Sequence, residues 1–342
     1  MAHNENPSVA KIEVYSGKLI ERILTLELVR VTERAAVSAA LLRGKGREKE
    51  ADQAAVEAMR RELNKLQIDA TIVIGEGERD KAPMLFIGEK LGKGGAKVDI
   101  AVDPLEGTTL CAQDMPGSIC VMAMAEQGTL LAAPDVYMKK VAVGPGYPPG
   151  VVDLDWEPED NIRSVANAKG VPVEDIGVLV LDRPRHVELV KRIRDFGARV
   201  RLIPDGDVAG IIYTTQPWRT GIDLYLGTGA APEGVLAAGA LRCIGGQMQG
   251  RLVLDSEEAL KRAYAMGVKD PNKRYDMTEL ASGDVIVAAT GVTNGPLLDG
   301  VLFRKDKVIE TDTVVYRSAN GTVRRIKAEH REIGKFYLGD VL

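Results

Sequence analysis

The chain has 342 residues, of which 45% are hydrophobic, 27% charged and 4% aromatic, and its formal net charge is −4. This composition is typical of a globular protein with a sizeable core and excludes extensive disorder. No basic stripe with interleaved aromatic residues argues for a nucleic-acid partner, and no run reaches the roughly 18 apolar residues of a membrane helix. With three cysteines in no CxxC spacing and a polar N-terminus, we expect a cytoplasmic enzyme or binding protein.

Two helices are predicted at the start of the chain. From about Tyr15 to Arg43, apolar residues recur at steps of three and four, as on the buried face of an amphipathic helix. Gly44 ends this helix, and a second is expected from about Ala51 to Leu66. Asp52 then falls in its first turn, where the helix dipole favours an anion, and this placement alone would explain the residue.

Two strands follow, and each ends in acidic residues. ATIVIGEGE carries Glu76 and Glu78, and VDIAVDPLEGTT carries Asp103 and Glu106. In the second strand, apolar residues alternate with Asp99, Ala101 and Asp103, which predicts one apolar face and one face with carboxylates. We expect Pro104 to end its hydrogen-bond ladder, since proline has no backbone N–H.

The middle of the chain predicts an α/β layer. Residues 119–143 suggest a pair of strands, and the Gly/Pro-rich run 144–150 suggests a hinge that divides the chain into subdomains 1–150 and 151–342. Three strand-then-helix units follow between residues 176 and 246, which favours a substantially parallel sheet. The final strands, 284–342, are expected to pack back on the first subdomain, with a hairpin turn at SANG.

The predicted strand ends carry an unusual set of side chains, namely IGEGE, VDPLEGTT, LDRPRH, IPDGD and GTGAAPEG. Ligands gather at the carboxyl ends of strands in open α/β sheets. Carboxylates held close together repel one another and either take up protons or recruit a cation. Glu76, Asp103, Glu106 and Glu233 offer only oxygen ligands, which suit magnesium or manganese better than zinc or copper.

The residues after Glu106 fit phosphate chemistry. Thr108 or Thr109 could orient an attacking water, and the Gly107 backbone with the following amides could hold a phosphate. Each acid alone has a plainer explanation as a helix cap or a water-facing side chain. The fixed spacing of DPxEGT directly after an alternating strand is not explained in that way.

At this point the sequence resembles a known family. DPxEGT is similar to the metal-binding signature of the lithium-sensitive phosphatase superfamily. The stretches ADQAAVEAMR, TIVIGEGERDKAPML, VDIAVDPLEGTT, APDVYMKK, RPRH, IPDGDVA and GAAPEGV occur in the order seen in class II fructose-1,6-bisphosphatases. The resemblance covers about residues 15–330. It implies a layered αβαβα sugar-phosphatase fold, with metal binding in the first subdomain and substrate binding in the second.

The same resemblance implies an activity. The protein would hydrolyse the 1-phosphate of fructose-1,6-bisphosphate to fructose 6-phosphate and phosphate, using water activated by two or more Mn²⁺ or Mg²⁺ ions. This reaction belongs to gluconeogenesis or, in an autotroph, to the Calvin cycle. Cyanobacterial members also hydrolyse sedoheptulose-1,7-bisphosphate, and the family suggests a homodimer or homotetramer. The sequence does not decide between the metals or the two sugars, nor does it identify effectors or the oligomer number.

Site residues are implied position by position. Metal ligands are expected at Asp52, Glu76, Asp103, Glu106 and Glu233. Thr108 would position the water, with Glu76 and Asp103 as further catalytic residues. The implied substrate contacts lie at strand ends and are Glu106, Gly107, Thr108, Tyr137, Arg183, Pro184, Arg185, Asp205, Gly206, Asp207 and Ala230.

The sequence departs from the family pattern at two of these positions. Arg183 stands where relatives often have lysine, and an arginine can replace it with different geometry. Ala230 stands where relatives have a glycine that contacts substrate, so its methyl group could shift a backbone contact.

Other interpretations remain open. An inositol monophosphatase-like enzyme or a nucleotide phosphatase of the same superfamily is the nearest alternative. GTGAAPEG raises the possibility of a dinucleotide-dependent oxidoreductase, but the run lacks the third glycine of GxGxxG. A non-catalytic, metal-stabilised binding protein is a third. Lys45 could meet a phosphate or lie in a solvated loop, and Glu78 could support the site or pair with Arg79 or Lys81.

Overall fold

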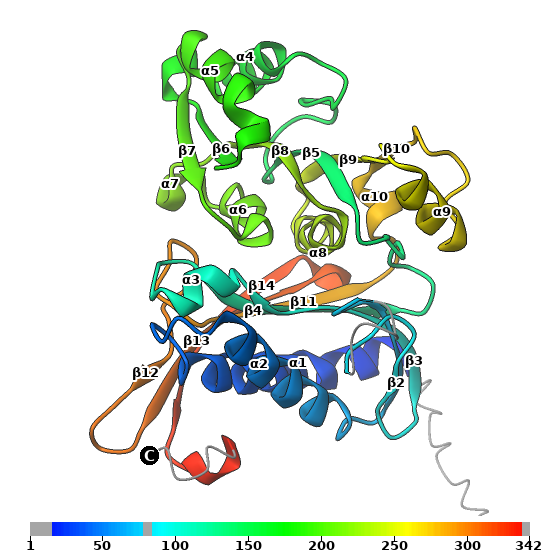
Figure 1. Ribbon diagram of the computed structural model, residues 1–342, viewed down its shortest axis with the longest axis vertical. Helices are drawn as coiled ribbons and strands as arrows, with labels where there is room; N and C mark the ends of the chain where they lie inside the picture. The colour runs from blue at the N-terminus through cyan, green and yellow to red at the C-terminus, as the bar shows by residue number, and fades with distance from the viewer. Residues whose placement is uncertain (1–15, 78–83, 337–342) are drawn as a thin grey trace, which may run out of the picture.

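The computed structural model describes residues 16–77 and 84–336 as helices and two mixed sheets in alternating layers (Figure 1). The first sheet contains β1 (Ile68–Ile74), β2 (Lys90–Leu91), β3 (Ala96–Glu106), β4 (Ile119–Glu126), β11 (Val285–Gly291), β12 (Leu302–Phe303), β13 (Ile309–Arg317) and β14 (Thr322–His330). The second contains β5 (Tyr137–Val143), β6 (Gly177–Leu181), β7 (Arg199–Ile203), β8 (Leu224–Ala230), β9 (Gln247–Leu252) and β10 (Arg274–Asp276). The helices are α1 (Ser16–Ala40), α2 (Glu48–Leu63), α3 (Thr108–Ala112), α4 (Pro158–Lys169), α5 (Val187–Asp195), α6 (Asp207–Tyr213), α7 (Pro217–Thr220), α8 (Ala231–Arg242), α9 (Glu257–Ala265) and α10 (Met277–Leu280).

Three apolar cores hold the layers together. The first sheet has the order β12-β13-β11-β4-β3-β1-β2, with β14 beside β13, and the second has the order β10-β9-β5-β8-β6-β7. Helices α1 and α2 cover the outer face of the first sheet, α8 and α6 lie between the sheets, and α4 and α5 cover the outer face of the second (Figure 1). This α/β layering confirms the predicted fold class. Within the described residues, none of the helices combines the length and apolar character that crossing a membrane requires.

Helix α2 buries the face that its sequence predicts. Ala55, Met59 and Leu63 are fully buried against α1 and the first sheet. The helix begins at Glu48, earlier than expected, so the acids of its first turn are Glu48 and Glu50. Asp52 therefore lies beyond the first turn, and the helix dipole explains its position less well than the sequence suggested.

Strand β3 does not stop at its proline. It continues through Pro104 to Glu106, and its pairing with β4 shifts register between Asp103 and Glu106. A proline is tolerated at such an irregularity because its missing N–H interrupts no regular ladder. Both faces of the strand are covered, since Ile100 packs with α1 and α2 while Ala101 packs on the α8 side.

The two strands predicted within residues 119–143 are present, but they do not pair with each other. Strand β4 pairs with β3 and β11, whereas β5 pairs with β8 and β9 in the other sheet. The chain thus changes sheet within residues 127–136. The Gly/Pro-rich run comes after β5 and is tied to Gln247, which accepts from the Gly150 N–H at 2.9 Å and donates to the Pro148 carbonyl at 2.8 Å.

We propose that the chain forms two subdomains, each built on one sheet. On this basis the boundary lies at the change of sheet rather than at residue 150. Strands β11 to β14 join the first sheet, as the sequence analysis expected of the final strands.

Within the second sheet, parallel pairing is confined to three strands, and in the first sheet β1 pairs parallel with β3. Strand β6 runs parallel to β7 and β8, which belong to the predicted strand–helix units. Strands β5, β9 and β10 pair antiparallel, so the sheet is mixed rather than substantially parallel. The hairpin at SANG is confirmed between β13 and β14.

Truncation of Ile100 tests the core beneath β3. Ile100 is fully buried in the centre of the first sheet, so Ile100→Ala should lower the free energy of unfolding by about 2–5 kcal/mol through lost contacts and a residual cavity. Urea unfolding followed by circular dichroism measures this change. Lys97→Ala, an exposed position of the same strand, should change it by less than about 0.5 kcal/mol. Equal effects of the two substitutions would contradict this packing.

Candidate active site

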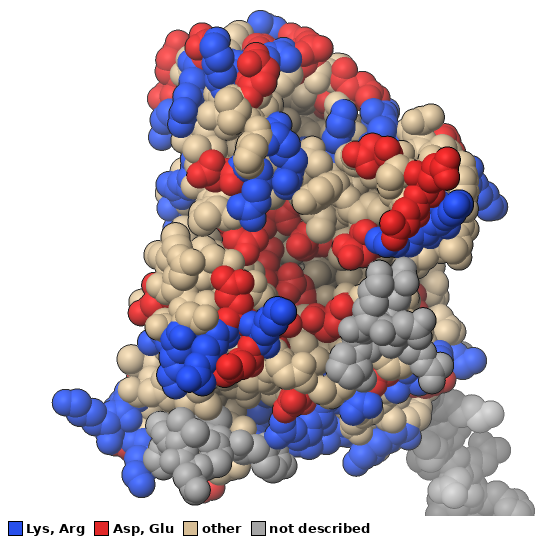
Figure 2. Space-filling model, in the orientation of Figure 1, with Lys and Arg blue, Asp and Glu red and all other residues tan. Residues whose placement is uncertain are grey.

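Acidic residues from both sheets converge on one hollow. Figure 2 shows acidic side chains gathered in the central hollow of the molecule's face, with basic side chains above them. A cavity of about 220 Å³ is lined by Glu76 after β1, Asp103 of β3 and Glu233 of α8, together with Asp135 and Ala230. The ends of strands from two sheets thus meet where the sequence predicted a site.

The side chains of Asp52 and Glu76 lie in hydrogen-bonding contact. The Glu76 carboxyl donates a hydrogen bond to Asp52, and burial together with the charge of Asp52 raises the pKa of Glu76 to about 8. Burial also raises the pKa of Asp52, although the bond from Glu76 opposes this. The structure therefore brings together two predicted ligands that are far apart in the chain.

Asp103 and Glu106 lie deeper in the same acidic group. Burial raises the pKa of Asp103 well above its usual value, and the charges of Glu106 and Glu233 raise it further. Burial likewise raises the pKa of Glu106, with contributions from Asp207 and Glu233. Carboxyl groups whose pKa values rise through mutual repulsion fit a site that a cation would neutralise.

Glu106 also fastens α6 to the end of β3. Its carboxylate accepts hydrogen bonds from the Val208 N–H at 2.6 Å and the Ala209 N–H at 3.1 Å. These bonds satisfy two N–H groups at the start of α6 that have no partner within the helix. Glu106 is therefore a structural link between the two sheets as well as a predicted ligand.

Glu233 has one held oxygen and one free oxygen. The residue lies in the first turn of α8, and the Ala230 N–H donates to its carboxylate. Its Oε2 atom is buried without a hydrogen-bond partner. Burial and the charge of Asp207 raise its pKa to about 7, against the opposing charge of Lys140. Ala230 itself has φ −70° and ψ 150°, which alanine adopts without strain.

The acidic residues offer the oxygen donors that a hard divalent cation prefers, but their side chains are not arranged as a complete set of metal ligands. In residues 16–77 and 84–336, no three His, Cys, Asp or Glu side chains stand together as a metal site. The donors are nevertheless all carboxylates, burial and then neighbouring charges raise the pKa values of Asp103 and Glu106, and a buried Glu233 oxygen lacks a partner. These features suit Mg²⁺ or Mn²⁺, so the ligand roles remain a prediction.

The turn from β3 into α3 requires its glycine. Gly107 has φ +75°, and a Cβ atom there would lie 2.8 Å from Leu110 Cδ1. Thr108 follows as the first residue of α3 and remains partly exposed. The turn thus places Thr108 at the start of α3, two residues after Glu106.

The two predicted arginines are anchored differently. Arg185 Nε and Nη2 donate to the Thr228 carbonyl at 2.9 and 2.7 Å, and its guanidinium lies 4.5 Å from the centre of the Tyr137 ring. Arg183 donates to the Pro204 carbonyl and pairs with Asp205 at 3.7 Å. Pro184 begins the short 3₁₀ turn between them.

His186 fixes this arginine loop, and the sequence analysis gave it no role. Its Nε2 accepts from the Thr228 N–H at 2.8 Å, and its Nδ1 lies 2.8 Å from the Leu181 carbonyl. The side chain is buried, and burial lowers its pKa. Because Nε2 accepts, the proton of the neutral ring belongs on Nδ1. No feature of the sequence distinguishes this histidine from a solvent-exposed one.

The DGD turn presents one partly exposed and one buried carboxylate. Gly206 has φ +87° and precedes α6, and the Asp205 side chain accepts from its N–H at 3.0 Å. Asp207 is buried, pairs with Lys140 at 2.5 Å and accepts from the Tyr225 hydroxyl at 3.1 Å. Lys140 was not predicted from the sequence, although alternation along β5 places it on the same buried face as Met138.

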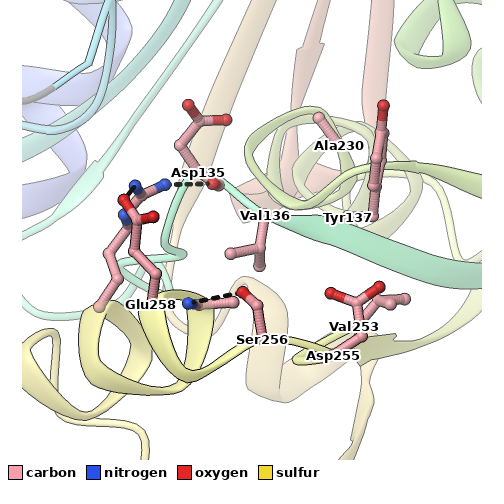
Figure 3. Close-up of a pocket in the computed structure, with 10 residues that line it drawn as sticks. Asp135, Val136, Tyr137, Ala230, Val253, Asp255, Ser256 and Glu258 are labelled. Atoms are coloured by element: carbon pink, nitrogen blue, oxygen red, sulfur yellow. Dashed lines mark hydrogen bonds and ion pairs between the residues drawn. The ribbon is translucent and has the colours of Figure 1, made fainter.

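A second, larger cavity adjoins the acidic one. Its volume is about 470 Å³, and it shares Asp135 and Ala230 with the acidic cavity. In Figure 3, Asp135 and Tyr137 point to the same side, while Ser256 and Glu258 come from the start of α9 on the opposite wall. Asp135 therefore lines both spaces and is another residue that the sequence analysis missed.

Two further sequence interpretations gain no support from the structure. Lys45 lies exposed in the turn after α1. Glu78, Arg79 and Lys81 lie outside the described residues, so the proposed roles of Glu78 stay predictions.

Comparison with known proteins decides the family. Residues 22–330 match the family described as "Bacterial fructose-1,6-bisphosphatase, glpX-encoded". The chain belongs to this family. Its members hydrolyse a phosphate monoester and depend in general on divalent metal ions. The family assignment leaves the dinucleotide-dependent alternative without support.

Curated relatives agree with this assignment. Proteins from Synechococcus sp. (strain JA-3-3Ab) and from Synechocystis sp. are each 44% identical over 91% of this chain, covering 96% and 97% of their own lengths. A protein from Prochlorococcus marinus is 44% identical over 92% of this chain and 98% of its own. All three are named "D-fructose 1,6-bisphosphatase class 2/sedoheptulose 1,7-bisphosphatase".

The raised pKa of Glu76 predicts how stability depends on pH in the presence of a chelator. The folded state holds a proton up to a pH of about 8 that the unfolded state releases near pH 4.5. The unfolded state then binds fewer protons, so the free energy of unfolding falls as pH rises through this window. Each such group contributes a slope of up to about 1.4 kcal/mol per pH unit.

Urea unfolding at pH 5, 6, 7 and 8 with a chelator measures this slope. Glu76→Gln stays neutral and should flatten the profile, whereas Glu57→Gln, an exposed position of α2, should leave it unchanged. A flat wild-type profile, or a Glu76→Gln profile as steep as the wild type, would show that these acids are not held close together.

Proposed function

We propose that this protein hydrolyses the 1-phosphate of fructose-1,6-bisphosphate and releases fructose 6-phosphate and inorganic phosphate. The observation that carries the proposal is the joint placement of five acids and a two-arginine loop around the ends of both sheets in a chain of this family. One acidic region and one basic region match a substrate with two phosphates, of which only one reacts.

The acidic region would hold the cofactor. We assign Asp52, Glu76, Asp103, Glu106 and Glu233 as ligands of Mn²⁺ or Mg²⁺, with two or more ions per site. When bound, such ions neutralise phosphate charge and lower the pKa of the attacking water. The unpartnered Oε2 of Glu233 and the close contact of the Asp52 and Glu76 carboxyl groups support this assignment. The choice between the two metals remains open.

The chain's own groups would orient the reaction. The Thr108 hydroxyl holds the attacking water in line with the ester, with Glu76 and Asp103 beside it to accept its proton. The water oxygen forms a bond to phosphorus as the bond to the sugar O1 breaks, and O1 leaves with a proton. The Gly107 turn and the following N–H groups support the phosphate oxygens.

The basic loop would hold the phosphate that does not react. Arg185 stacks on Tyr137 and is held in place by the Thr228 carbonyl, so its guanidinium loses little freedom on binding. Arg183 and Pro184 complete the loop, while Asp205, Gly206 and Asp207 face the sugar. Ala230 lies at the rim shared by the two cavities, where its methyl group would meet the substrate.

We extend the proposal to sedoheptulose-1,7-bisphosphate as a second substrate. The relatives' names include this activity, and the seven-carbon sugar presents the same reacting end. The cavity beside Tyr137 and Ala230 supports the proposal by leaving space next to the sugar site. A role in gluconeogenesis, or in the Calvin cycle of an autotroph, would follow.

We also propose a cellular location and an assembly state. The three cysteines are all free and buried, as suits a reducing compartment, and we propose the cytoplasm. A homodimer or homotetramer is proposed from the resemblance to the family.

Phosphate release from a panel of substrates tests the proposed activity. With Mn²⁺ or Mg²⁺, the wild type should release phosphate from fructose-1,6-bisphosphate, and a chelator should abolish the release. Asp103→Asn should lower kcat by at least about 100-fold, because it removes a charge at the reacting centre. Asp195→Asn, exposed on α5, should retain wild-type activity. Equal activity on inositol monophosphate or a nucleotide would favour the alternative phosphatases.

Arg185→Ala tests the binding of the distal phosphate. Loss of a charge-assisted contact should raise KM by about 10- to 100-fold, with kcat changed far less, because this phosphate does not react. Initial rates over a range of fructose-1,6-bisphosphate concentrations separate the two constants. Arg194→Ala, exposed on α5, serves as the control. A loss confined to kcat would place Arg185 at the reacting phosphate instead.

A further inference from the structure

A buried ion pair lies beneath the candidate site. Lys140 of β5 and Asp207 of α6 are both buried, and Lys140 Nζ lies 2.5 Å from Asp207 Oδ2. The hydroxyl of Tyr225, which is fully buried in β8, donates to the same oxygen at 3.1 Å. Side chains from two strands, β5 and β8, therefore meet on one carboxylate oxygen of α6.

Two glycines make room for this arrangement. A Cβ atom at Gly229 would lie 1.9 Å from Asp207 Oδ2 and 3.1 Å from Lys140 Nζ. A Cβ atom at Gly234 would lie 2.8 Å from Met138 Sδ, beside the Lys140 chain. The backbone of β8 and α8 is thus shaped to admit the pair, which is a specific feature and not a chance surface contact.

The charges around the pair explain why a buried lysine is needed. Asp207 lies near Glu106 and Glu233, and its charge raises the pKa of both. A buried carboxylate surrounded by other carboxylates is costly unless a nearby cation pairs with it. Lys140 supplies that cation from below, and it also opposes the rise in the pKa of Glu233.

Both contacts fall on Oδ2 and leave the other oxygen available. Across the described residues, no hydrogen bond reaches Asp207 Oδ1, and this atom is not among the fully buried side-chain atoms without a partner. Oδ1 therefore keeps its capacity to accept a hydrogen bond, because Lys140 and Tyr225 both contact Oδ2. An ionised carboxylate with one oxygen fixed and one open accepts a hydrogen bond from a hydroxyl in a single orientation.

We infer that Lys140 and Tyr225 are positioning residues that fix Asp207 through Oδ2, so that Oδ1 accepts a hydrogen bond from a sugar hydroxyl. This inference rests on the proposed function, which places Asp207 against the sugar. The trio then selects phosphate esters of polyhydroxylated sugars by holding the acceptor in place before the substrate arrives. Neither residue touches the substrate, so each acts only through Asp207.

Tyr225→Phe is the mildest test, because it removes one hydroxyl and keeps the ring. It should raise KM for fructose-1,6-bisphosphate about five- to tenfold, the size of one lost hydrogen bond, and change kcat by less than about twofold. Lys140→Met should raise KM further and lower the melting temperature, because it leaves Asp207 buried without its cation. Steady-state kinetics and thermal unfolding provide both readouts.

Lys169→Met is a matched control for the ion pair. Lys169 also pairs with a buried aspartate, Asp223, at 2.6 Å, but beneath the outer layer of the second sheet. It should lower the melting temperature and leave KM unchanged. If Lys140→Met behaved in the same way, the pair would be purely structural and the inference would be overturned.

Combining each substitution with Asp207→Asn tests whether Lys140 and Tyr225 act through Asp207. In that variant the acceptor is already altered, so Tyr225→Phe and Lys140→Met should add less than about twofold to KM. Full additivity of the effects would overturn the inference, since it would mean that the residues act independently. If Lys140→Met fails to fold, Tyr225→Phe in the two backgrounds decides the question alone.

Failure of the proposed activity can be distinguished from failure of the positioning role. A wild type that releases no phosphate from fructose-1,6-bisphosphate would reject the activity and the inference together. An active wild type whose KM is unaffected by Tyr225→Phe would reject only the positioning role.

Discussion

Repulsion among buried carboxylates is the constraint on which this structure depends. Burial and mutual charge raise the pKa values of Glu76, Asp103, Glu106 and Glu233, so the folded chain concentrates acids where they are costly. Local donors hold some of them in place: backbone N–H groups bind Glu106 and Glu233, and Lys140 compensates the neighbouring Asp207. A bound cation would relieve this repulsion, and phosphatases of this family depend in general on divalent metal ions.

The two sheets divide the chemistry between them. The first sheet supplies acids at the ends of β1 and β3, and the second supplies the arginine loop after β6, the DGD turn after β7 and Glu233 after β8. Helix α8 lies between the sheets and carries Glu233 in its first turn, so packing of the central layer sets the distance between the acidic and basic regions (Figure 1). The connections from β3, β6, β7 and β8 to the helical turns that follow them are at most three residues long, which limits the movement of the side chains that they carry.

Preorganisation recurs on the basic side. His186 and the Thr228 backbone hold the loop and Arg185 before any substrate binds, while Asp205 restrains Arg183. Ion pairs at this partly exposed loop contribute little to stability. Their effect is to limit the positions that the two guanidinium groups can take before a ligand binds.

Local sequence determined those features that depend on near neighbours. Periodicity predicted α1, α2 and the strand–helix units, and the spacing of DPxEGT predicted the turn at Gly107 with its acids and hydroxyl. Tertiary structure alone decided which strands pair, because a hydrogen-bond ladder joins residues that the chain order does not mark as partners. It separated β4 from β5, carried β3 past Pro104 and buried Lys140 against Asp207. Period and turn chemistry act over a few residues, whereas pairing and charge compensation are settled only when distant segments share the same desolvated space.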